Sequence, residues 1–118
     1  MKHNQKIGKI GEQIAGLYLE ANEFEIIERN FRTIRGEIDI IAKKNGAIHF
    51  VEVKTRTDTY IRARQAIDKR KCSHIWKTAE YYLYKNKIKD VRCHIDAIEV
   101  YIESHSLKVN YIEQIVEK

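Results

Sequence analysis

The segment from residue 36 to residue 56 constrains the fold more than any other part of the chain. It contains two stretches with strand-like alternation of apolar and polar residues, and Asn45-Gly46 lies between them. An Asn-Gly pair in this setting is the strongest short-range signal for a β-hairpin, because both residues tolerate the positive φ of a tight turn. The sequence therefore predicts two antiparallel strands joined at Asn45 and Gly46.

A two-residue turn at this position determines which residues face each other across the hairpin. In that register Asp39 faces Glu52. Two residues further from the turn, Glu37 faces Lys54. A loop of four residues is the alternative, and it would move Asp39 away from Glu52 while leaving the two faces of the hairpin unchanged.

The two faces of this hairpin differ in chemistry, because side chains alternate across a strand. The apolar face is expected to carry Ile38, Ile40, Ala42, His49, Val51 and Val53. The opposite face gathers Asp39, Glu52 and Lys54. Directly opposed carboxylates destabilise a sheet unless a cation neutralises them. This face therefore predicts a site for a divalent cation, and a solvated strand face without a ligand is the alternative.

Hydrophobic periodicity predicts the other elements. Residues 4–22 and 64–85 show the spacing of amphipathic helices, and strands are expected over residues 24–32, 91–102 and 107–112. The resulting order is α-β-β-β-α-β-β in a single domain over residues 1–118. This order predicts an α/β fold with a mixed central β-sheet flanked by helices.

The first helix contains three glycines. Its buried stripe is expected to consist of Ile7, Ile10, Ile14, Leu17 and Ala21. Gly8, Gly11 and Gly16 each cost roughly 1 kcal/mol relative to alanine, which predicts the close approach of another backbone or a ligand. Glu12 lies off the stripe and beside these small residues, so we expect a carboxylate in a shallow notch. An exposed Glu12 on a loosely packed helix is the alternative.

The second helix is expected to end at Asn86. Its predicted core residues are Ile67, Cys72, Ile75, Ala79, Tyr82 and Leu83.

Several functional classes are disfavoured by composition and spacing. No apolar run approaches the length of a membrane span, and the N-terminus has no apolar signal region. Cys72 and Cys93 fit the reduced thiols of a cytoplasmic protein. Neither Cys72-Ser73-His74 nor Cys93-His94 has the spacing of a zinc knuckle. A phosphate-binding glycine loop and a nucleophile elbow are also absent from the sequence.

Positive charge is concentrated in one segment. The chain carries a net charge of +5, and residues 54–77 alone contain eight basic and two acidic residues. A basic stretch beside a candidate metal site favours a polyanionic partner, most simply nucleic acid. A solvated helix face without a ligand is the alternative.

The carboxylates suit hydrolysis of phosphodiester bonds. Asp39 and Glu52 offer oxygen ligands of the kind that Mg²⁺ or Mn²⁺ prefers. Such hydrolysis needs a metal that lowers the pKa of its bound water and a cation that orients this water. Lys54 shares the strand face of Glu52 and is placed for the second role. Glu12 is expected to be a further ligand or to hold a metal-bound water.

Four sequence blocks occur in a specific order. They are G-K-I-G-E-Q-I-A-x-x-Y-L, N-F-R, G-E-I-D-I-I-A and F-V-E-V-K-T-R. Together they resemble the YraN-like family of small bacterial proteins, over roughly residues 7 to 100. That family is similar to the restriction-endonuclease-like, PD-(D/E)xK superfamily and its Holliday junction resolvases.

The resemblance implies a restriction-endonuclease-like core and Mg²⁺-dependent cleavage. It implies metal ligation by Asp39, Glu52 and the main-chain carbonyl of Val53, with Lys54 as the catalytic lysine and Glu12 as the helix carboxylate. The residues expected to contact nucleic acid are Arg56, Arg62, Arg64, Gln65, Lys69 and Lys71. Asp96 matches an aspartate of a late strand and is interpreted as structural.

Three positions depart from the family pattern. Ile38 replaces the proline of the superfamily motif, and Glu23 stands where the family tends to have glycine after the first helix. The segment from Thr57 to Arg64 lacks the glycine and proline usual before the second helix, which bears on a substrate contact by Gln65. None of the three removes a candidate catalytic group.

The sequence thus predicts a nuclease that cuts DNA, including branched or structured DNA, with Mg²⁺ or Mn²⁺. A non-catalytic nucleic-acid-binding module with the same fold is the alternative, and an RNA phosphodiesterase is a third hypothesis. A homodimer is expected if the substrate is a junction, because junction cutters need two sites.

Overall fold

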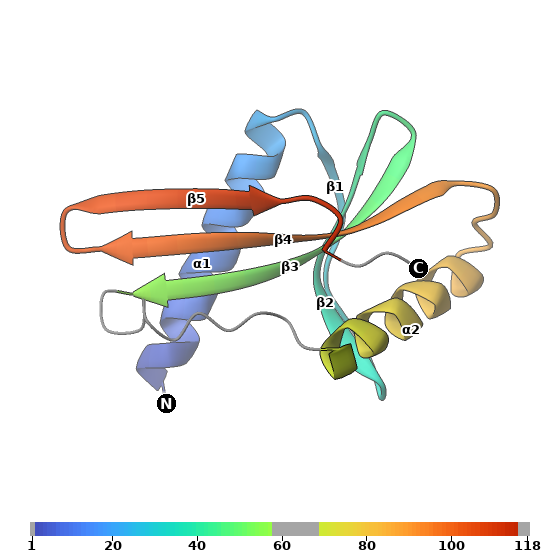
Figure 1. Ribbon diagram of the computed structural model, residues 1–118, viewed down its shortest axis with the longest axis horizontal. Coiled ribbons are helices and arrows are strands. Elements are labelled where there is room, and N and C mark those ends of the chain that lie inside the picture. The colour runs from blue at the N-terminus through green and yellow to red at the C-terminus, as the bar shows by residue number, and fades with distance from the viewer. Residues whose placement is uncertain (1, 58–68, 116–118) are drawn as a thin grey trace.

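A five-stranded sheet and two helices form the part of the chain that the computed structural model describes, residues 2–57 and 69–115 (Figure 1). The elements in chain order are α1 (Lys2–Ala21), β1 (Glu25–Thr33), β2 (Gly36–Lys44), β3 (Ala47–Thr57), α2 (Lys69–Lys85), β4 (Arg92–Glu103) and β5 (Ser106–Ile112). The predicted order of elements and the mixed α/β class are confirmed. Residues 64–68 of the second predicted helix lie outside the described residues.

The strands follow one another in the sheet in the order of the sequence, β1-β2-β3-β4-β5. All neighbouring pairs are antiparallel except β3 and β4, which are parallel. A parallel pair requires a long crossover connection, and α2 lies in the connection between these two strands. The sheet is therefore mixed, as predicted.

The hairpin of β2 and β3 has the predicted two-residue turn. Asn45 and Gly46 have φ angles of 52° and 79°, and Lys44 pairs with Ala47. The four-residue loop is therefore excluded. The ladder runs as far as the pair Ile40 and Val51 and goes no further.

Beyond that pair, β2 and β3 separate, and two details of the predicted hairpin are wrong. Glu37 pairs with Arg32 of β1 rather than facing Lys54, because β2 stays paired with β1 after it has left β3. Ile38 packs with Phe31 in the apolar cluster on the α2 side, away from Ile40. The cause is the bend of β1 and β2 toward α2, which Figure 1 shows.

The two helices cover opposite faces of the sheet. One apolar cluster joins α2 to the sheet through residues such as Phe50, Ile75 and Tyr82. The other joins α1 to the sheet through residues such as Leu19 and Val51. Phe50 and Val51 are neighbours on β3 and belong to different clusters, as the alternation of side chains along a strand requires.

The buried stripe of α1 differs from the predicted one. Ala15 and Leu19 are fully buried, whereas Ile10 and Leu17 are 45% and 66% exposed. Gly11 explains why a different face of α1 is buried. It lies so close to the sheet that a Cβ at this position would be 1.9 Å from Oγ1 of Thr55 on β3. Gly11 and Gly16 therefore lie on the buried face, whereas Gly8 meets no neighbour, and Glu12 lies at the edge of this face, partly buried.

The core of α2 agrees with the prediction where the structure describes it. Ile75, Ala79 and Tyr82 are buried, and Leu83 packs at the edge of their cluster. Ile67 and the side chain of Cys72 lie outside the described residues.

Both helices end in a left-handed residue that is not glycine. Glu23 follows α1 with a φ of 68°, and the N–H of Phe24 donates to the carbonyl of Leu19. After α2 this place belongs to Lys87, with a φ of 55°, while Asn86 binds back to the carbonyl of Tyr82. Neither helix has, in its described residues, the length and apolar character needed to span a bilayer.

We predict opposite effects for two glycine-to-alanine substitutions in α1. Gly11→Ala should lower the free energy of unfolding by about 1–3 kcal/mol, because the new methyl group would overlap Thr55. Gly8→Ala should raise it by up to about 1 kcal/mol, because a Cβ there meets nothing within 4 Å. Urea unfolding of both variants measures the difference, and equal effects would contradict the close packing of α1 on β3.

Glu23→Gly should stabilise the protein. Glycine adopts a φ near +68° without the steric penalty that a Cβ imposes, so we expect a gain of about 0.5–1 kcal/mol. Glu20→Gly is the matched control, because Glu20 is exposed within the last turn of α1 and glycine should there cost about 1 kcal/mol. Chemical denaturation of the two variants should give opposite signs.

Candidate active site

Asp39 lies at the point where β2 and β3 separate. The β2–β3 ladder ends at the pair Ile40 and Val51, so β2 offers no main-chain acceptor to the N–H of Val53. The carboxylate of Asp39 takes this place, and its Oδ2 accepts the Val53 N–H at 2.7 Å. The separation of the strands therefore positions the Asp39 side chain against the main chain of β3.

Glu52 and Lys54 come from the adjacent part of β3, and alternation places both side chains on the other side of this strand from Val51 and Val53. Glu52 is buried, with 7% of its surface exposed. Nζ of Lys54 lies 3.3 Å from Oε2 of Glu52. The spacing of two along a strand brings this carboxylate and this ammonium together, as the sequence predicts.

A cleft of about 630 Å³ joins Asp39 and Glu52 to Glu12 of α1. Its lining residues are Glu12, Arg32, Thr33, Ile34, Arg35, Gly36, Glu37, Asp39, Glu52 and Val53. Three carboxylates of the predicted site therefore share one cleft with Val53. The cleft is open to ligands, because exposed residues such as Ile34 and Glu37 form its outer wall.

The carboxylates in this cleft repel one another. Burial and the negative charges of Glu52, Glu12 and Glu37 together raise the pKa of Asp39 to about 7, although the hydrogen bond from the Val53 N–H opposes the shift. Burial also raises the pKa of Glu12, with a contribution from Glu37, while Arg32, Lys9 and Arg29 lower it. A bound cation would relieve this conflict.

The residues predicted to contact nucleic acid are only partly described. The guanidinium of Arg56 is largely buried and lies 3.8 Å from Oε2 of Glu99 on β4. Arg62, Arg64 and Gln65 lie outside the described residues. Lys69 and Lys71 belong to the first turn of α2, and their side chains are outside the described part as well. Their contact with nucleic acid stays a prediction.

Two features of the structure were not predicted from the sequence. Arg32 and Arg35 line the carboxylate cleft from the β1–β2 hairpin, and Arg32 lies 3.5 Å from Glu37. The N-F-R block before the hairpin was the available signal for Arg32. The second feature is a cluster of His49, His94 and Asp96, in which His49 and Asp96 are buried and His94 is half-buried. Nitrogen and oxygen atoms of these three side chains, which could bind a metal ion, lie within 4.8 Å of one another. It depends on the parallel pairing of β3 with β4, which local patterns do not reveal.

Comparison with known proteins identifies the family. The family model described as "Uncharacterised protein family UPF0102" matches residues 11–100 of the chain. The chain belongs to this family. The matched part contains Glu12, Asp39, Glu52 and Lys54, and it also contains Asp96.

Relatives of the UPF0102 family extend over nearly the whole chain. A UPF0102 protein of Acetivibrio thermocellus is 45% identical over 105 residues, which are 86% of this chain and 81% of the relative. A UPF0102 protein of Clostridium acetobutylicum is 40% identical over 113 residues, 93% of each chain. One of Caldanaerobacter subterraneus is 40% identical over 116 residues, 94% of this chain and 95% of the relative.

We predict that Asp39→Asn stabilises this UPF0102 protein in a buffer with a metal chelator. The pKa of the Asp39 carboxyl group is 3.8 in the unfolded chain and about 7 in the folded protein. Ionisation of this group therefore destabilises the folded protein. The gain should be absent below about pH 4, should grow between pH 4 and pH 7, and should then stay level at roughly 1–3 kcal/mol.

Urea unfolding at pH 5 and pH 8 measures this gain. Glu20→Gln is the control, because Glu20 is exposed on α1, away from the cleft. A loss of stability of Asp39→Asn at pH 8 would contradict the electrostatic conflict described above.

Proposed function

We propose that this UPF0102 protein is a metal-dependent nuclease with a restriction-endonuclease-like core that hydrolyses phosphodiester bonds in DNA. The observation that carries the proposal is the clustering of Asp39, Glu52 and Lys54 where β2 and β3 separate. Carboxylates that share one cleft, with a lysine beside one of them, are the groups that metal-assisted phosphodiester hydrolysis requires.

The donor set of the cleft fits Mg²⁺ or Mn²⁺. Both ions prefer oxygen ligands and are held by one or two carboxylates together with water and substrate phosphate. Asp39 and Glu52 would supply the carboxylates, the main-chain carbonyl of Val53 a further oxygen, and Glu12 a ligand or a contact to a bound water. The raised pKa of Asp39, caused by burial and by Glu52, supports this fit, because a cation would stabilise the ionised carboxylate. The ion would supply charge neutralisation and an acidified water.

The chain's own residues would orient the reaction. The Val53 N–H holds the Asp39 carboxylate in one direction, and the ion pair with Glu52 holds the Lys54 ammonium beside it. The Lys54 side chain keeps 26% of its surface exposed, so it can reach a substrate phosphate or an attacking water. Lys54 would thus orient the nucleophile and stabilise the negative charge that develops on the phosphate.

Basic residues around the cleft fit a polyanionic substrate. Arg32 and Arg35 line it from one side. Residues 54–77 carry eight basic and two acidic residues, and this segment begins at Lys54 itself. Contacts of this kind hold the sugar-phosphate backbone without reading base sequence. Cleavage of a branched substrate on two strands would require two such sites, so a homodimer belongs to the proposal for branched DNA.

Cleavage of branched, single-stranded and duplex DNA in the presence of Mg²⁺ or Mn²⁺ tests the proposal. Asp39→Asn, Glu52→Gln and Lys54→Met should each lower the cleavage rate by about 100-fold or more, because each removes a ligand or the orienting cation. Glu20→Gln, an exposed change of the same kind on α1, should leave the rate unchanged. Chelator should abolish cleavage, and added metal should restore it.

Two outcomes would overturn the proposal. One is the absence of cleavage of all three substrates with either ion, together with metal binding that Asp39→Asn leaves unchanged. The other is DNA binding that falls with salt but is indifferent to metal and to Lys54→Met, which would identify a non-catalytic binding module. Preferential cleavage of RNA in competition with DNA would instead assign the activity to RNA.

A further inference from the structure

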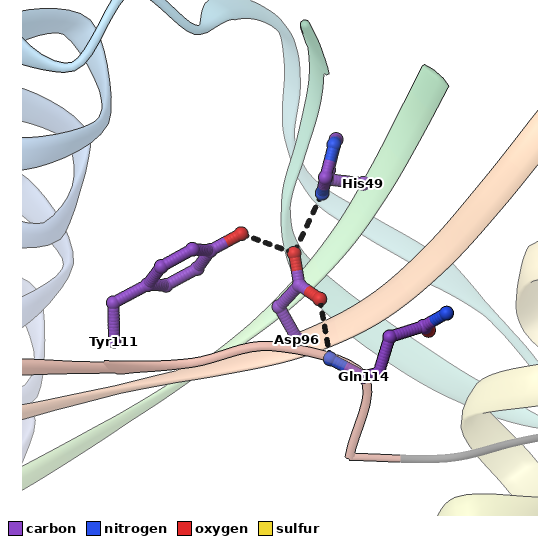
Figure 2. A network of polar contacts seen from close by, with 4 residues as sticks. All are labelled: His49, Asp96, Tyr111 and Gln114. Carbon is purple, nitrogen blue, oxygen red and sulfur yellow. Dashed lines mark hydrogen bonds and ion pairs between the residues drawn. The ribbon is translucent and has the colours of Figure 1, made fainter.

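A second polar cluster lies on the α1 side of the sheet, the face opposite to Glu52 and Lys54. His49 on β3 pairs in register with His94 on β4, and Asp96 follows two residues later on the same face of β4. Tyr111 reaches the cluster from β5, and Figure 2 shows its hydroxyl and His49 converging on the Asp96 carboxylate. Asp96 is fully buried and His49 is 8% exposed.

The carboxylate of Asp96 is held in its ionised form. Burial alone would raise the pKa of Asp96, but hydrogen bonds from His49, Tyr111 and the Gln114 N–H outweigh this effect and lower it. His49 Nδ1 lies 2.7 Å from Oδ2, which also accepts from the Tyr111 hydroxyl, and the Gln114 N–H donates to Oδ1 at 2.9 Å. A carboxylate has about four lone-pair directions, so three donors leave one for a further partner.

The hydrogen bond to Asp96 also determines the tautomer of His49. An ionised carboxylate only accepts, so in the metal-free protein the proton of a neutral His49 ring is on Nδ1. An ion bound by His49 and Asp96 together would take the place of this proton, because ligand nitrogens must be deprotonated.

His94 contributes the independent observation. Its Nδ1 is buried and makes no hydrogen bond within the described part of the chain. A buried polar atom without a partner costs about 1–3 kcal/mol, so such atoms point to a bound water or ion. The His94 ring lies beside the His49 ring, with centroids 4.5 Å apart and a tilt of 33°.

A cavity of about 400 Å³ makes both imidazoles accessible. His49, His94 and Tyr111 belong to its wall, and the charged residues that line it are Lys44, Arg92 and Glu113. Lys44 is already engaged, because its Nζ donates to the Asn22 carbonyl at 2.7 Å and lies 4.8 Å from the centroid of the Phe24 ring. An ion can therefore reach the histidines from solvent.

We propose that His49, His94 and Asp96 bind one Zn²⁺ or a similar borderline-soft divalent ion. One nitrogen from each ring and one carboxylate oxygen lie within 4.8 Å of one another. Metal–ligand bonds near 2.0–2.1 Å require ligand separations of about 3.3 Å, so side-chain movements of about 1 Å complete the site. Imidazole nitrogens favour Zn²⁺ over Mg²⁺, which distinguishes this site from the all-oxygen cleft around Asp39.

The cavity side leaves a fourth position of the ion open to water or an anion. Arg92 at the cavity wall would favour an anion there. Three protein ligands and one open position are typical of zinc sites that keep a place for water or another small ligand, whereas structural zinc sites have four protein ligands. The site does not depend on nuclease activity, because its residues project from the other face of β3 and β4.

Titration of the metal-free full chain with Zn²⁺ by calorimetry tests the proposal, and Co²⁺ absorption spectra report the ligand geometry. We expect one ion per chain. His49→Gln and His94→Gln should each weaken binding by about tenfold or more, because each removes a ligand. Three controls should bind as tightly as the parent: His105→Gln in the exposed β4–β5 turn, Cys93→Ser beside His94, and Asp39→Asn in the carboxylate cleft.

The absence of stoichiometric binding would overturn the proposal, and so would unchanged affinity in a His49→Gln, His94→Gln double variant. Loss of binding in Cys93→Ser with retention in the histidine variants would also overturn it, because it would place the ion at a thiolate. Circular dichroism checks that each variant folds. Histidine ¹⁵N resonances of the parent protein need no variant, and they should shift for His49 and His94 when Zn²⁺ is added.

Discussion

The separation of β2 from β3 is the constraint on which the candidate active site depends. It ends the ladder at Ile40 and Val51, and it turns the N–H of Val53 into a donor that the Asp39 carboxylate must satisfy. The same separation opens the cleft in which Glu52 and Glu12 approach Asp39. A continuous hairpin would have closed this space with main-chain hydrogen bonds. The repulsion among the carboxylates in this cleft therefore follows from the position at which β2 and β3 separate.

The sheet presents different chemistry on its two faces. The face with Glu52 and Lys54 offers carboxylate oxygens and an ammonium, whereas the α1 side offers the imidazoles of His49 and His94. The alternation of side chains along β3 creates this difference, since residues 49 and 52 differ by an odd number of positions. One strand thereby contributes to an oxygen-rich cleft and to a nitrogen-rich cavity, and hard and soft divalent ions would distinguish the two.

The contrast between the hairpin and α1 shows which sequence patterns are reliable. The turn at Asn45 and Gly46 was predictable, because the positive φ angles of a tight turn restrict the residue types that fit. The buried face of α1 was not, because hydrophobic periodicity selects Ile10 and Leu17, whereas the sheet selects the face on which Gly11 lets Thr55 approach. The close packing of Gly11 on Thr55 outweighed the burial of Ile10 and Leu17. As a result, Glu12 lies at the edge of the buried face.

The sequence by itself determined the order of elements, the hairpin turn and the proximity of Glu52 to Lys54, because all of these follow from local alternation and turn sterics. Only the tertiary structure decided where β2 leaves β3, which cleft Glu12 joins, and that His49 meets His94. The physical reason is the range of the interactions. The parallel strands β3 and β4 are connected by a crossover that contains α2, and two apolar clusters pack against them. Their register therefore depends on long-range contacts that no local sequence pattern encodes.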